Sequence, residues 1–450
     1  MVTNQNCGMS ANLKIISDLR NFIALSCTDS NLKELFTNTE KAFTRKRKLH
    51  FERIVCILLN LFKKSYDIEL SEFFSCLGDE PLLVSKSAFC QQRTKISSLF
   101  FNYLSLFLAD RFYAHYDQEV KKWNGLRVIA VDGSTSYLID KEEVTTHFGS
   151  HGNQRGTVTL ARVLCAFDVL NKIVIKSGMY PIHLSEQKIA ARWLESYEPD
   201  MLLVYDRAYP GFGSIFQHQN KEIPQPFLMR CPLGFSSEVA AFVESGQKDA
   251  ICTFTANKGA CRDLKEQGFI VKPGAKIAVR LIRVTLDDGA IEVLVTNLLD
   301  GHKYPYAEFK ALYFKRWGIE TRFGCFKNQL QMEAFSGQKV ETILQDFYIT
   351  VFLSNLQEII SKPANGQVQQ SSSNRKHQYQ INRNAAIGLM KNRIIGLLLL
   401  NDPGAVLMQL ENLFAKYIEP VRPERKYTRI RKLKRRSGKY KTLTNYKRAV

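Results

Sequence analysis

Long apolar runs are missing from this sequence. No stretch approaches the roughly 20 consecutive apolar residues that a membrane-spanning helix needs. The first residues also lack the apolar core of a secretory signal peptide. We therefore expect a soluble, cytoplasmic protein without a membrane partner.

The sequence also lacks any regular spacing of its cysteines. The ten cysteines are scattered, and no two of them form a C-x-x-C pair. In a chain of this length such a distribution is typical of reduced thiols. It argues against both a disulfide framework and a zinc site.

Acidic residues are in short supply. Against 63 lysines and arginines there are 43 aspartates and glutamates, which gives a formal net charge of +20. A surplus this large indicates a polyanionic partner, most often nucleic acid. Residues 421–450 alone carry a net charge of +12. We expect this basic tail to bind DNA nonspecifically, with an affinity that falls steeply as salt rises.

The chain nevertheless contains enough apolar material for a large core. Its 450 residues are 45% hydrophobic and suffice for about two to four domains. Residues 1–118 have helical periodicity, so we predict a helical, DNA-binding N-terminal domain. Within it, a serine-capped helix would present Lys86 and Arg93 to a major groove. The alternative is an ordinary solvated helix.

Strand signals begin near residue 119. Two short apolar runs, residues 126–131 and 201–205, end in Asp132 and Asp206, as is typical of strands buried on both faces. Between them the sequence predicts a β-hairpin and then an amphipathic helix with a serine cap. This succession of strands and helix indicates an α/β architecture.

The segment "YFKRWGIETRFGCFKNQL", residues 313–330, places a lone acid among bases. At about 100° per residue, Tyr313, Arg316, Glu320 and Lys327 share one stripe of a helix. One interpretation is an exposed ion pair between Arg316 and Glu320, which stabilises by only a few tenths of a kcal/mol. The other is that Glu320 holds a metal ion while the bases grip phosphates. The neighbouring, buried face would comprise Leu312, Ile319, Phe323, Phe326 and Leu330.

Asp132, Asp206 and Glu320 have one shared explanation. Several carboxylates that converge from rigid elements repel one another unless a cation neutralises them. Oxygen ligands favour Mg²⁺ or Mn²⁺, and two such ions can activate an attacking hydroxyl in phosphoryl transfer. The alternative for each aspartate alone is a turn cap after a strand.

The motifs around these acids resemble a known family. "DGS" at Asp132, "YDRAY" at Asp206 and Y-x2-R-x3-E-x6-K from Tyr313 to Lys327 resemble the DDE transposases of bacterial insertion sequences. The last motif is similar to that of the insertion-sequence-four family. The resemblance covers about residues 127–336. It departs only where the common "DRGY" has alanine here, which leaves the acid in place.

The resemblance implies an α/β fold with an RNase H-like catalytic core that a β-rich insertion interrupts. It implies an enzyme dependent on Mg²⁺ (or Mn²⁺) that cuts double-stranded DNA at the terminal inverted repeats of its element. The enzyme would then join the 3′-hydroxyls to target DNA. Relatives of this type generally pair two ends as a dimer, so we expect a homodimer in the synaptic complex of a prokaryotic, nucleoid-associated protein.

The predicted segments follow from these patterns and the resemblance together. They are a helical, DNA-binding part at 1–118; catalytic core, first part, at 119–232; β-rich insertion at 233–300; catalytic core, second part, with the glutamate helix at 301–362; polar linker at 363–384; C-terminal helix at 385–418; and basic tail at 419–450.

By the same resemblance, the acids Asp132, Asp206 and Glu320 would be catalytic metal ligands. Arg316 and Lys327 would hold DNA phosphates near the cut.

Other residues are weaker candidates for DNA contact. Tyr313 would hydrogen-bond a phosphate or stack on a sugar or base. Arg207 and Arg230 would contact phosphates, with structural ion pairs as the alternative. Some relatives stack a flipped base on a tryptophan. In this chain Trp317 is a candidate for such stacking, and the interpretation we favour is that it packs against the fold.

Two other functions are compatible with these residues. One is an RNase H-like, metal-dependent nuclease that cleaves without strand transfer. The other is a catalytically inactive DNA-binding regulator derived from a transposase. Three intact acids argue against the regulator, because a pure DNA-binding protein gains nothing from three buried carboxyl groups.

Overall fold

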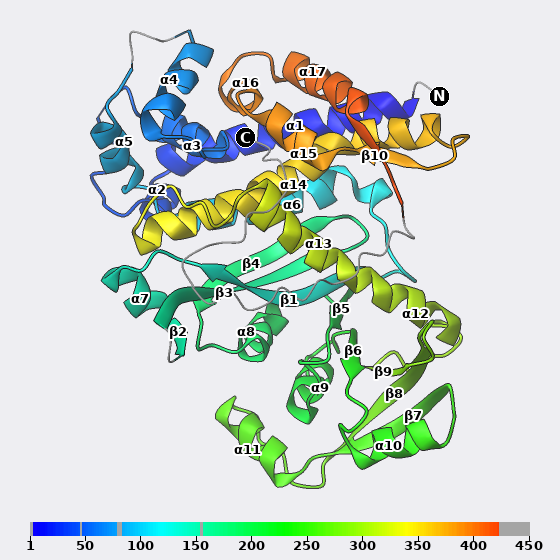
Figure 1. Cartoon of the computed structure of the whole chain (residues 1–450). Helices are drawn as coiled ribbons and strands as arrows, with labels where there is room; N and C mark the ends of the chain where they lie inside the picture. Colours follow the sequence, from blue (N-terminus) through cyan, green and yellow to red (C-terminus); the bar gives the residue numbers. More distant parts are fainter. Residues whose placement is uncertain (1–2, 46, 79–82, 154–155, 423–450) are drawn as a thin grey trace. The chain divides into compact units, whose positions relative to one another are not determined.

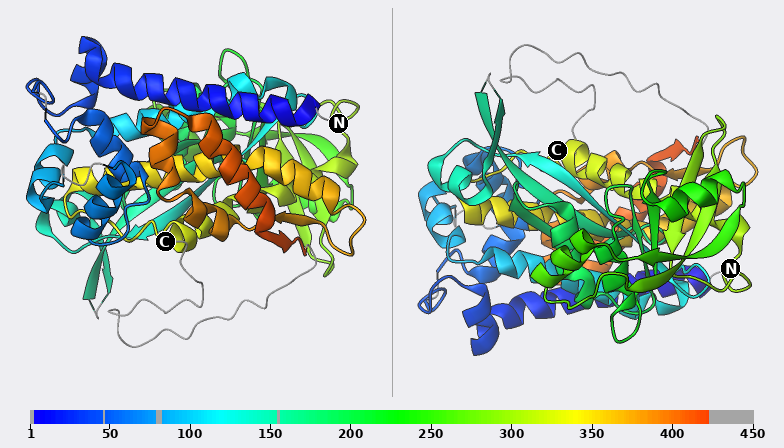
Figure 2. Two further views of the ribbon diagram at one scale, coloured as in Figure 1. Left: turned by 90° about the horizontal axis from the view of Figure 1, so that it is seen from above. Right: turned by 90° about the horizontal axis from the view of Figure 1, so that it is seen from below.

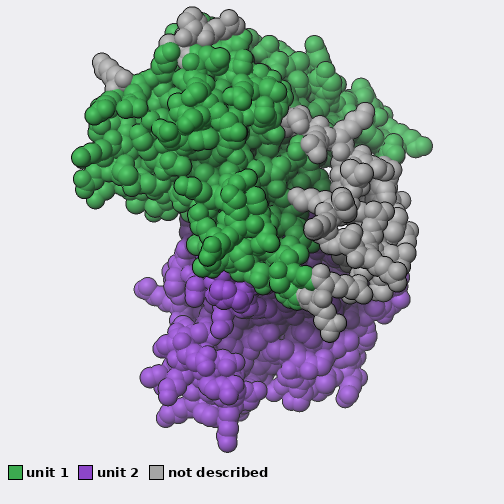
Figure 3. Space-filling view, turned by 60° about the vertical axis from the view of Figure 1, so that its left-hand side comes forward, with its two compact units in different colours: residues 1–119, 136–160, 323–450 green, residues 120–135, 161–322 purple. Residues whose placement is uncertain are grey.

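The structure is a computed structural model of the chain, and it describes residues 3–45, 47–78, 83–153 and 156–422 (Figure 1). The chain divides into two compact units, which Figure 3 shows in different colours. Unit 1 comprises residues 1–119, 136–160 and 323–450, and unit 2 comprises residues 120–135 and 161–322. Nearly all of the predicted basic tail lies outside the described residues.

The N-terminal part of unit 1 is helical, as the periodicity predicts. Its helices are α1 (Thr3–Thr28), α2 (Ser30–Phe36), α3 (Phe51–Leu59), α4 (Tyr66–Cys76), α5 (Lys86–Arg93) and α6 (Ser98–His115). The predicted serine cap is present on α5, where Ser85 Oγ accepts a hydrogen bond from the Ala88 amide at 3.2 Å. Within the part of the chain that the structure describes, no helix combines the length and apolarity that crossing a membrane needs.

The C-terminal part of unit 1 is built on one long helix, α14 (Val340–Ser371). It packs against α6 and against α17 (Pro403–Lys416), which also lies beside α1 (Figure 2, left). The end of α14 occupies residues 363–371, where the sequence predicts the start of a linker. Ala364 and Val368 are buried there, and this core contact holds a polar segment helical despite its proline.

The predicted single helix at 385–418 is three helices. These are α15 (Arg383–Met390), α16 (Arg393–Leu399) and α17. Asn392, with φ of +64°, separates α15 from α16, because a residue in the left-handed conformation interrupts a helix. Asp402 caps α17 with proline in its first turn, so a new helix begins there. The short strands β10 (Tyr379–Ile381) and β11 (Ile418–Pro420) pair antiparallel.

Unit 2 contains a mixed β-sheet, which confirms the α/β class. Its strands lie in the order β4-β3-β1-β5-β6-β9-β8-β7. In that order they span Ile173–Pro181, Gly156–Asp168, Arg127–Tyr137, Met201–Tyr205, Phe227–Cys231, Ile291–Thr296, Lys276–Thr285 and Asp249–Thr255. β5 runs parallel to both β1 and β6, whereas β3 and β4 form the predicted antiparallel hairpin. The last residues of β1 and the first residues of β3 belong to unit 1. The elements between them, α7 (Glu142–Phe148) and β2 (Ser150–Asn153), belong to unit 1 as well.

The strands predicted to form a separate inserted subdomain extend the same sheet. β9 pairs antiparallel with β6, where Leu228 lies opposite Thr296, and β8 and β7 follow outward. β8 and β9, which follow one another in the sequence, pair as an antiparallel hairpin. The helices α10 (Ser237–Glu244) and α11 (Lys258–Glu266) belong to this part of the chain.

The central strands are buried on both faces, as their continuous apolar runs predict. Ile129 and Val131 of β1 face one core, where α8 (Glu186–Trp193) and α9 (Phe212–Gln219) contribute side chains such as Ile189 and Ile215. Val128 faces the opposite core, to which α12 (Tyr306–Phe314) contributes residues including Phe309. The sheet therefore fixes the backbone of each strand end rigidly.

Candidate active site

The first two acids lie on neighbouring parallel strands of the sheet. In β1 and β5, Arg127 is opposite Met201 and Ala130 is opposite Val204. The same register, continued by two residues, places Asp132 opposite Asp206. Asp132 lies within β1, which continues to Tyr137, whereas Asp206 directly follows β5. Because neighbouring strands are about 4.8 Å apart, the two aspartates occupy adjacent fixed positions.

Asp132 is largely buried, and its side chain is 15% exposed. Burial raises the pKa of Asp132 to about 6, and the negative charges of Asp206 and Glu186 act in the same direction. The Gly133 amide, which donates to Asp132 Oδ1 at 2.8 Å, and the Arg316 guanidinium oppose that rise in pKa. Ionised Asp132 is thus a carboxylate whose charge is incompletely compensated.

Glu320 lies in a segment whose winding changes along its length. α12 is followed by a 3-10 turn (Lys315–Trp317), by α13 (Gly318–Gly324) and by a π-helical segment (Cys325–Gln329). The predicted buried face is confirmed, since Leu312, Ile319, Phe323, Phe326 and Leu330 are all buried. The segment is not one regular helix. Its 3-10 turn and its π-helical turn wind more tightly and more loosely than an α-helix, so side chains beyond each turn depart from the positions that about 100° per residue predicts.

Arg316 connects the acids. Its Nη1 lies 3.2 Å from Asp132 Oδ2, and its Nη2 lies 3.3 Å from Glu320 Oε1. The predicted ion pair between Arg316 and Glu320 is therefore present, but Arg316 is buried and shared with an acid 184 positions away. Its guanidinium carbon also lies 5.7 Å from the centre of the Tyr313 ring and 5.4 Å from that of Trp317.

The donor chemistry of this site fits a hard divalent cation. Asp132, Asp206 and Glu320 offer only oxygen atoms, which Mg²⁺ and Mn²⁺ prefer. As the side chains stand, however, no three Asp, Glu, His or Cys residues in the described ranges are close enough to share a metal ion. Between Asp132 and Glu320 the positive charge is that of Arg316.

Glu186 is a fourth carboxyl group near Asp132 that the sequence did not reveal. It lies in the first turn of α8, and its Oε1 accepts a hydrogen bond from Arg162 Nη1 at 2.6 Å. Its carboxylate also covers Gly133, so a side chain at position 133 would overlap it. A residue larger than the glycine of the "DGS" motif would therefore displace the carboxylate end of the Glu186 side chain, a contact that no local pattern indicates.

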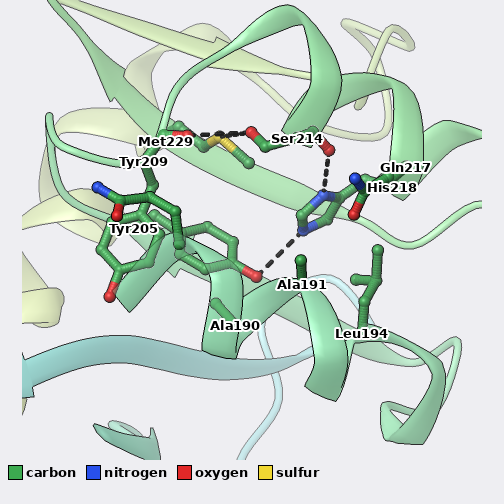
Figure 4. A pocket seen from close by; sticks show the side chains of 10 residues that line it. Ala190, Ala191, Leu194, Tyr205, Tyr209, Ser214, Gln217, His218 and Met229 are labelled. Atoms are coloured by element: carbon green, nitrogen blue, oxygen red, sulfur yellow. Dashed lines mark hydrogen bonds between the residues drawn. The ribbon is translucent and has the colours of Figure 1, made fainter. Parts of the chain in front are cut away.

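A small cavity of about 20 Å³, room for about one water molecule, lies behind the end of β5 (Figure 4). Figure 4 shows His218 between Tyr205 and Ser214. Burial lowers the pKa of His218 to about 4, so the ring is neutral. Its Nδ1–H donates to Ser214 O at 2.7 Å, and Nε2 accepts from the Tyr205 hydroxyl at 3.1 Å. This network anchors the residue that directly precedes Asp206.

Three further predicted site residues lie in unit 2. Tyr313 is 4% exposed, burial raises its pKa to about 12, and it contacts Arg316 through its ring. That enclosure differs from the predicted contact with a phosphate or base. Arg207 is exposed directly after Asp206. Arg230 Nη2 lies 2.9 Å from Glu292 Oε1, which is the structural ion pair considered as its alternative role.

Trp317 differs from expectation. The sequence predicts that it packs against the fold, whereas the side chain is 50% exposed. The 3-10 turn explains the difference, because its tighter winding turns this residue outward from the buried stripe.

The predicted DNA contacts of unit 1 have different surroundings. Lys86 is exposed on α5, with Nζ 5.1 Å from the centre of the Tyr66 ring. Arg93, by contrast, is 1% exposed and donates to Asp346 Oδ1 at 2.8 Å and to Gln345 Oε1 at 2.7 Å. Arg93 thus has a structural role in place of the predicted one, because a major groove cannot reach an enclosed guanidinium. Lys327 is half-buried, and burial lowers its pKa.

Comparison with known proteins agrees with these motifs. Residues 123–356 match the family described as the transposase DDE domain. That match covers more than half of the sequence, so the chain belongs to the transposase DDE domain family. All of the acids described above fall inside the matched region.

Two particular proteins are similar to this chain. The transposase InsG for insertion sequence element IS4, from Escherichia coli (strain K12), is 22% identical over 238 residues. That alignment covers 52% of this chain and 52% of InsG, so the chain spans about half the length of this relative. A cryo-EM structure of a piggyBac transposase synaptic complex with hairpin DNA is 9% identical, with a TM-score of 0.38 over 92% of this chain and 80% of that one.

Proposed function

We propose that this protein is a DNA transposase whose catalytic acids are Asp132, Asp206 and Glu320. The observation that carries the proposal is the β1–β5 register, which brings two motif aspartates to neighbouring positions on parallel strands. Arg316 contacts both Asp132 and the motif glutamate. All three acids lie inside the region that matches the family.

The strand order supports an RNase H-like core. In β4-β3-β1-β5-β6 the hairpin strands lie on one side of β1, and two parallel strands lie on the other. The first acid lies on the central strand, the second follows its parallel neighbour, and the third is on a helix. This is the arrangement that the family resemblance implies.

Asp132, Asp206 and Glu320 would hold Mg²⁺ (or Mn²⁺). When bound, such ions polarise a phosphodiester and activate the attacking hydroxyl for cleavage and for strand transfer. Residues of the chain would orient the carboxylates and bind the DNA backbone. The Gly133 and Ala208 amides, which donate to Asp132 and Asp206 at 2.8 Å, hold the carboxylates in fixed orientations. Arg207 is exposed beside them and would contact the phosphate backbone.

The partners of this activity would be the terminal inverted repeats of the element and the target DNA. Lys86 and Lys327 remain candidate phosphate contacts in unit 1, and the basic tail would add nonspecific affinity. We expect a homodimer in the synaptic complex and a cytoplasmic, nucleoid-associated location. A nuclease without strand transfer is the second function, and only the fate of the 3′-hydroxyl separates it from a transposase.

The buried state of Asp132 argues against a regulator without catalysis. Burial of an ionisable carboxyl group next to other acids costs folding free energy. A protein that only binds DNA would lower that cost by replacing Asp132 with a neutral residue. A catalytic role explains why the acid is kept.

The test is cleavage and strand transfer by the full chain on duplexes that carry the element ends. We expect Asp132→Asn, Asp206→Asn and Glu320→Gln each to lower cleavage at least about 1,000-fold while DNA binding is retained. Asp287→Asn is the matched control, because Asp287 is an exposed acid of the same unit. Wild-type rates in any of the three variants would refute the site. Cleavage without joined products would establish the nuclease.

A further inference from the structure

The arrangement of Arg316 raises a question about when the acids can accept metal. Its guanidinium is buried and contacts Asp132 with one terminal nitrogen and Glu320 with the other. A cation shared by these carboxylates would need the same oxygen atoms. A guanidinium and a divalent ion in one place would also repel each other. Both cannot occupy the position between the two acids.

The guanidinium is not held on every side. Its Nε is buried and makes no hydrogen bond of good geometry, although the Tyr313 hydroxyl lies close enough to interact with the guanidinium. One of its acid partners is also accessible: the Glu320 side chain is 43% exposed, against 15% for Asp132. Trp317, which contacts the guanidinium, is 50% exposed. Arg316 itself is buried, so another anion would reach it from the side of these two exposed neighbours, Glu320 and Trp317.

A DNA phosphate is such an anion. Guanidinium and phosphate form bidentate, charge-assisted hydrogen bonds that are stronger than most neutral ones. The net charge of +20 brings DNA to the protein. If Arg316 turns to a phosphate, Asp132 and Glu320 lose their shared positive charge and become a site that requires another cation.

We propose that Arg316 is a placeholder cation that couples metal binding to DNA binding. In the DNA-free protein it neutralises Asp132 and Glu320 and keeps the affinity for divalent cations low. A DNA phosphate draws it away and frees both carboxylates for the metal. The inference rests on the proposed function, because it assigns these acids as metal ligands. By thermodynamic reciprocity, metal also strengthens DNA binding by the same factor.

The direct test is Mn²⁺ binding by the full chain at pH 8 without DNA, measured from the free Mn²⁺ signal in electron paramagnetic resonance. We expect Arg316→Ala to bind Mn²⁺ at least about tenfold more tightly than the wild type. Arg207→Ala is the matched control, because it removes an equal charge beside Asp206 but no bridge, and it should change the affinity less than about threefold. An Arg316→Ala affinity no higher than that of Arg207→Ala would overturn the proposal.

A second arm adds an uncleavable duplex of the element end. Wild-type affinity for Mn²⁺ should then rise to about that of Arg316→Ala, and Asp132→Asn should abolish the gain. Unchanged wild-type affinity would also overturn the proposal. These outcomes are separate from those of the cleavage assay: the placeholder role can fail while cleavage still depends on the three acids. If Asp132→Asn and Glu320→Gln left both Mn²⁺ binding and cleavage unchanged, the proposed function itself would fail.

A third readout covers the case in which Arg316→Ala folds poorly. Arg316 lies against the Trp317 ring, so its departure changes the surroundings of that indole. The difference in fluorescence between the wild type and Trp317→Phe isolates the Trp317 emission. Saturating Mg²⁺ should shift this emission in wild-type protein and leave it unchanged in Asp132→Asn. An unmoved wild-type signal at Mg²⁺ saturation would contradict displacement of Arg316.

Discussion

At the scale of single residues, the site depends on side chains that meet from distant positions. The sequence singled out Asp132 and Asp206 because each follows an apolar run, although β1 continues past Asp132 to Tyr137. It could not indicate that Arg316 contacts Asp132, since that pairing depends on tertiary structure and not on local spacing. Glu186 gave no sequence signal for the same reason: only the folded chain brings its carboxylate over Gly133.

The contact between Gly133 and Glu186 leads to a prediction. Gly133→Ala should lower DNA cleavage and destabilise unit 2 by up to about 1 kcal/mol, because the new methyl group displaces the Glu186 carboxylate from its ion pair with Arg162. Urea unfolding and cleavage rates measure the two effects. The double variant Gly133→Ala/Glu186→Ala should recover most of the lost stability relative to Glu186→Ala alone. Additive losses would show that the overlap is not the cause.

Glu411 of α17 gives a pH-dependent prediction. Burial raises its pKa from 4.5 to about 7, and one carboxyl oxygen has no partner. The folded state therefore favours the protonated form, and stability falls as pH rises from about 4.5 to about 7. Glu411→Gln should raise the melting temperature at pH 8, by the equivalent of about 1–3 kcal/mol, and have little effect at pH 4.5.

The control for that prediction is Glu34→Gln, a change of an exposed glutamate on α2. It should shift the melting temperature by the same small amount at both pH values, because an exposed carboxyl group loses no hydration on folding. A Glu411→Gln effect that does not grow with pH would contradict the assigned burial cost.

At the scale of secondary structure, apolar pattern predicted most elements. β1 and β5 were predictable because strands buried on both faces are continuously apolar. The composite segment that carries Glu320 was not, because 3-10 and π turns arise where packing competes with regular winding. The break at Asn392 was missed because a left-handed asparagine is set by its surroundings as well as by its type.

The link between α9 and β5 can be tested directly. His218→Ala should destabilise the protein by about 2–4 kcal/mol, since it leaves a cavity and removes the partner of the buried Tyr205 hydroxyl. His183→Ala removes an exposed histidine of the same unit and should have an effect below about 0.5 kcal/mol. Chemical denaturation measures both. Equal effects of the two changes would remove the anchoring role.

At the scale of the whole molecule, charge rather than shape was the informative property. The surplus of +20 indicated a polyanionic partner, and the family match is consistent with DNA. Composition could not reveal how Arg93 is used, because a buried arginine and an exposed one count equally. Arg93 is buried together with Asp346, so this pair adds nothing to the positive surface that faces solvent.

Removal of residues 423–450 tests the contribution of the tail, which carries +11 of the net charge. Truncation should weaken nonspecific duplex binding and reduce the slope of log affinity against log salt concentration by several units. Fluorescence anisotropy from about 50 to 200 mM salt gives both quantities. Replacement of the tail by a neutral sequence of equal length is the control for chain length. If the truncated protein kept a slope as steep as that of the wild type, the phosphate contacts would lie elsewhere in the chain.

The pairing of β6 with β9 has a consequence for how this architecture can change. Without the chain from residue 233 to 300, β6 would present a row of bare amides and carbonyls beside fully apolar neighbours such as Leu228 and Met229. An unpaired strand of this kind can pair with a strand of another molecule. Residues 233–300 therefore cover the open side of β6, and we expect a variant that lacks them to aggregate.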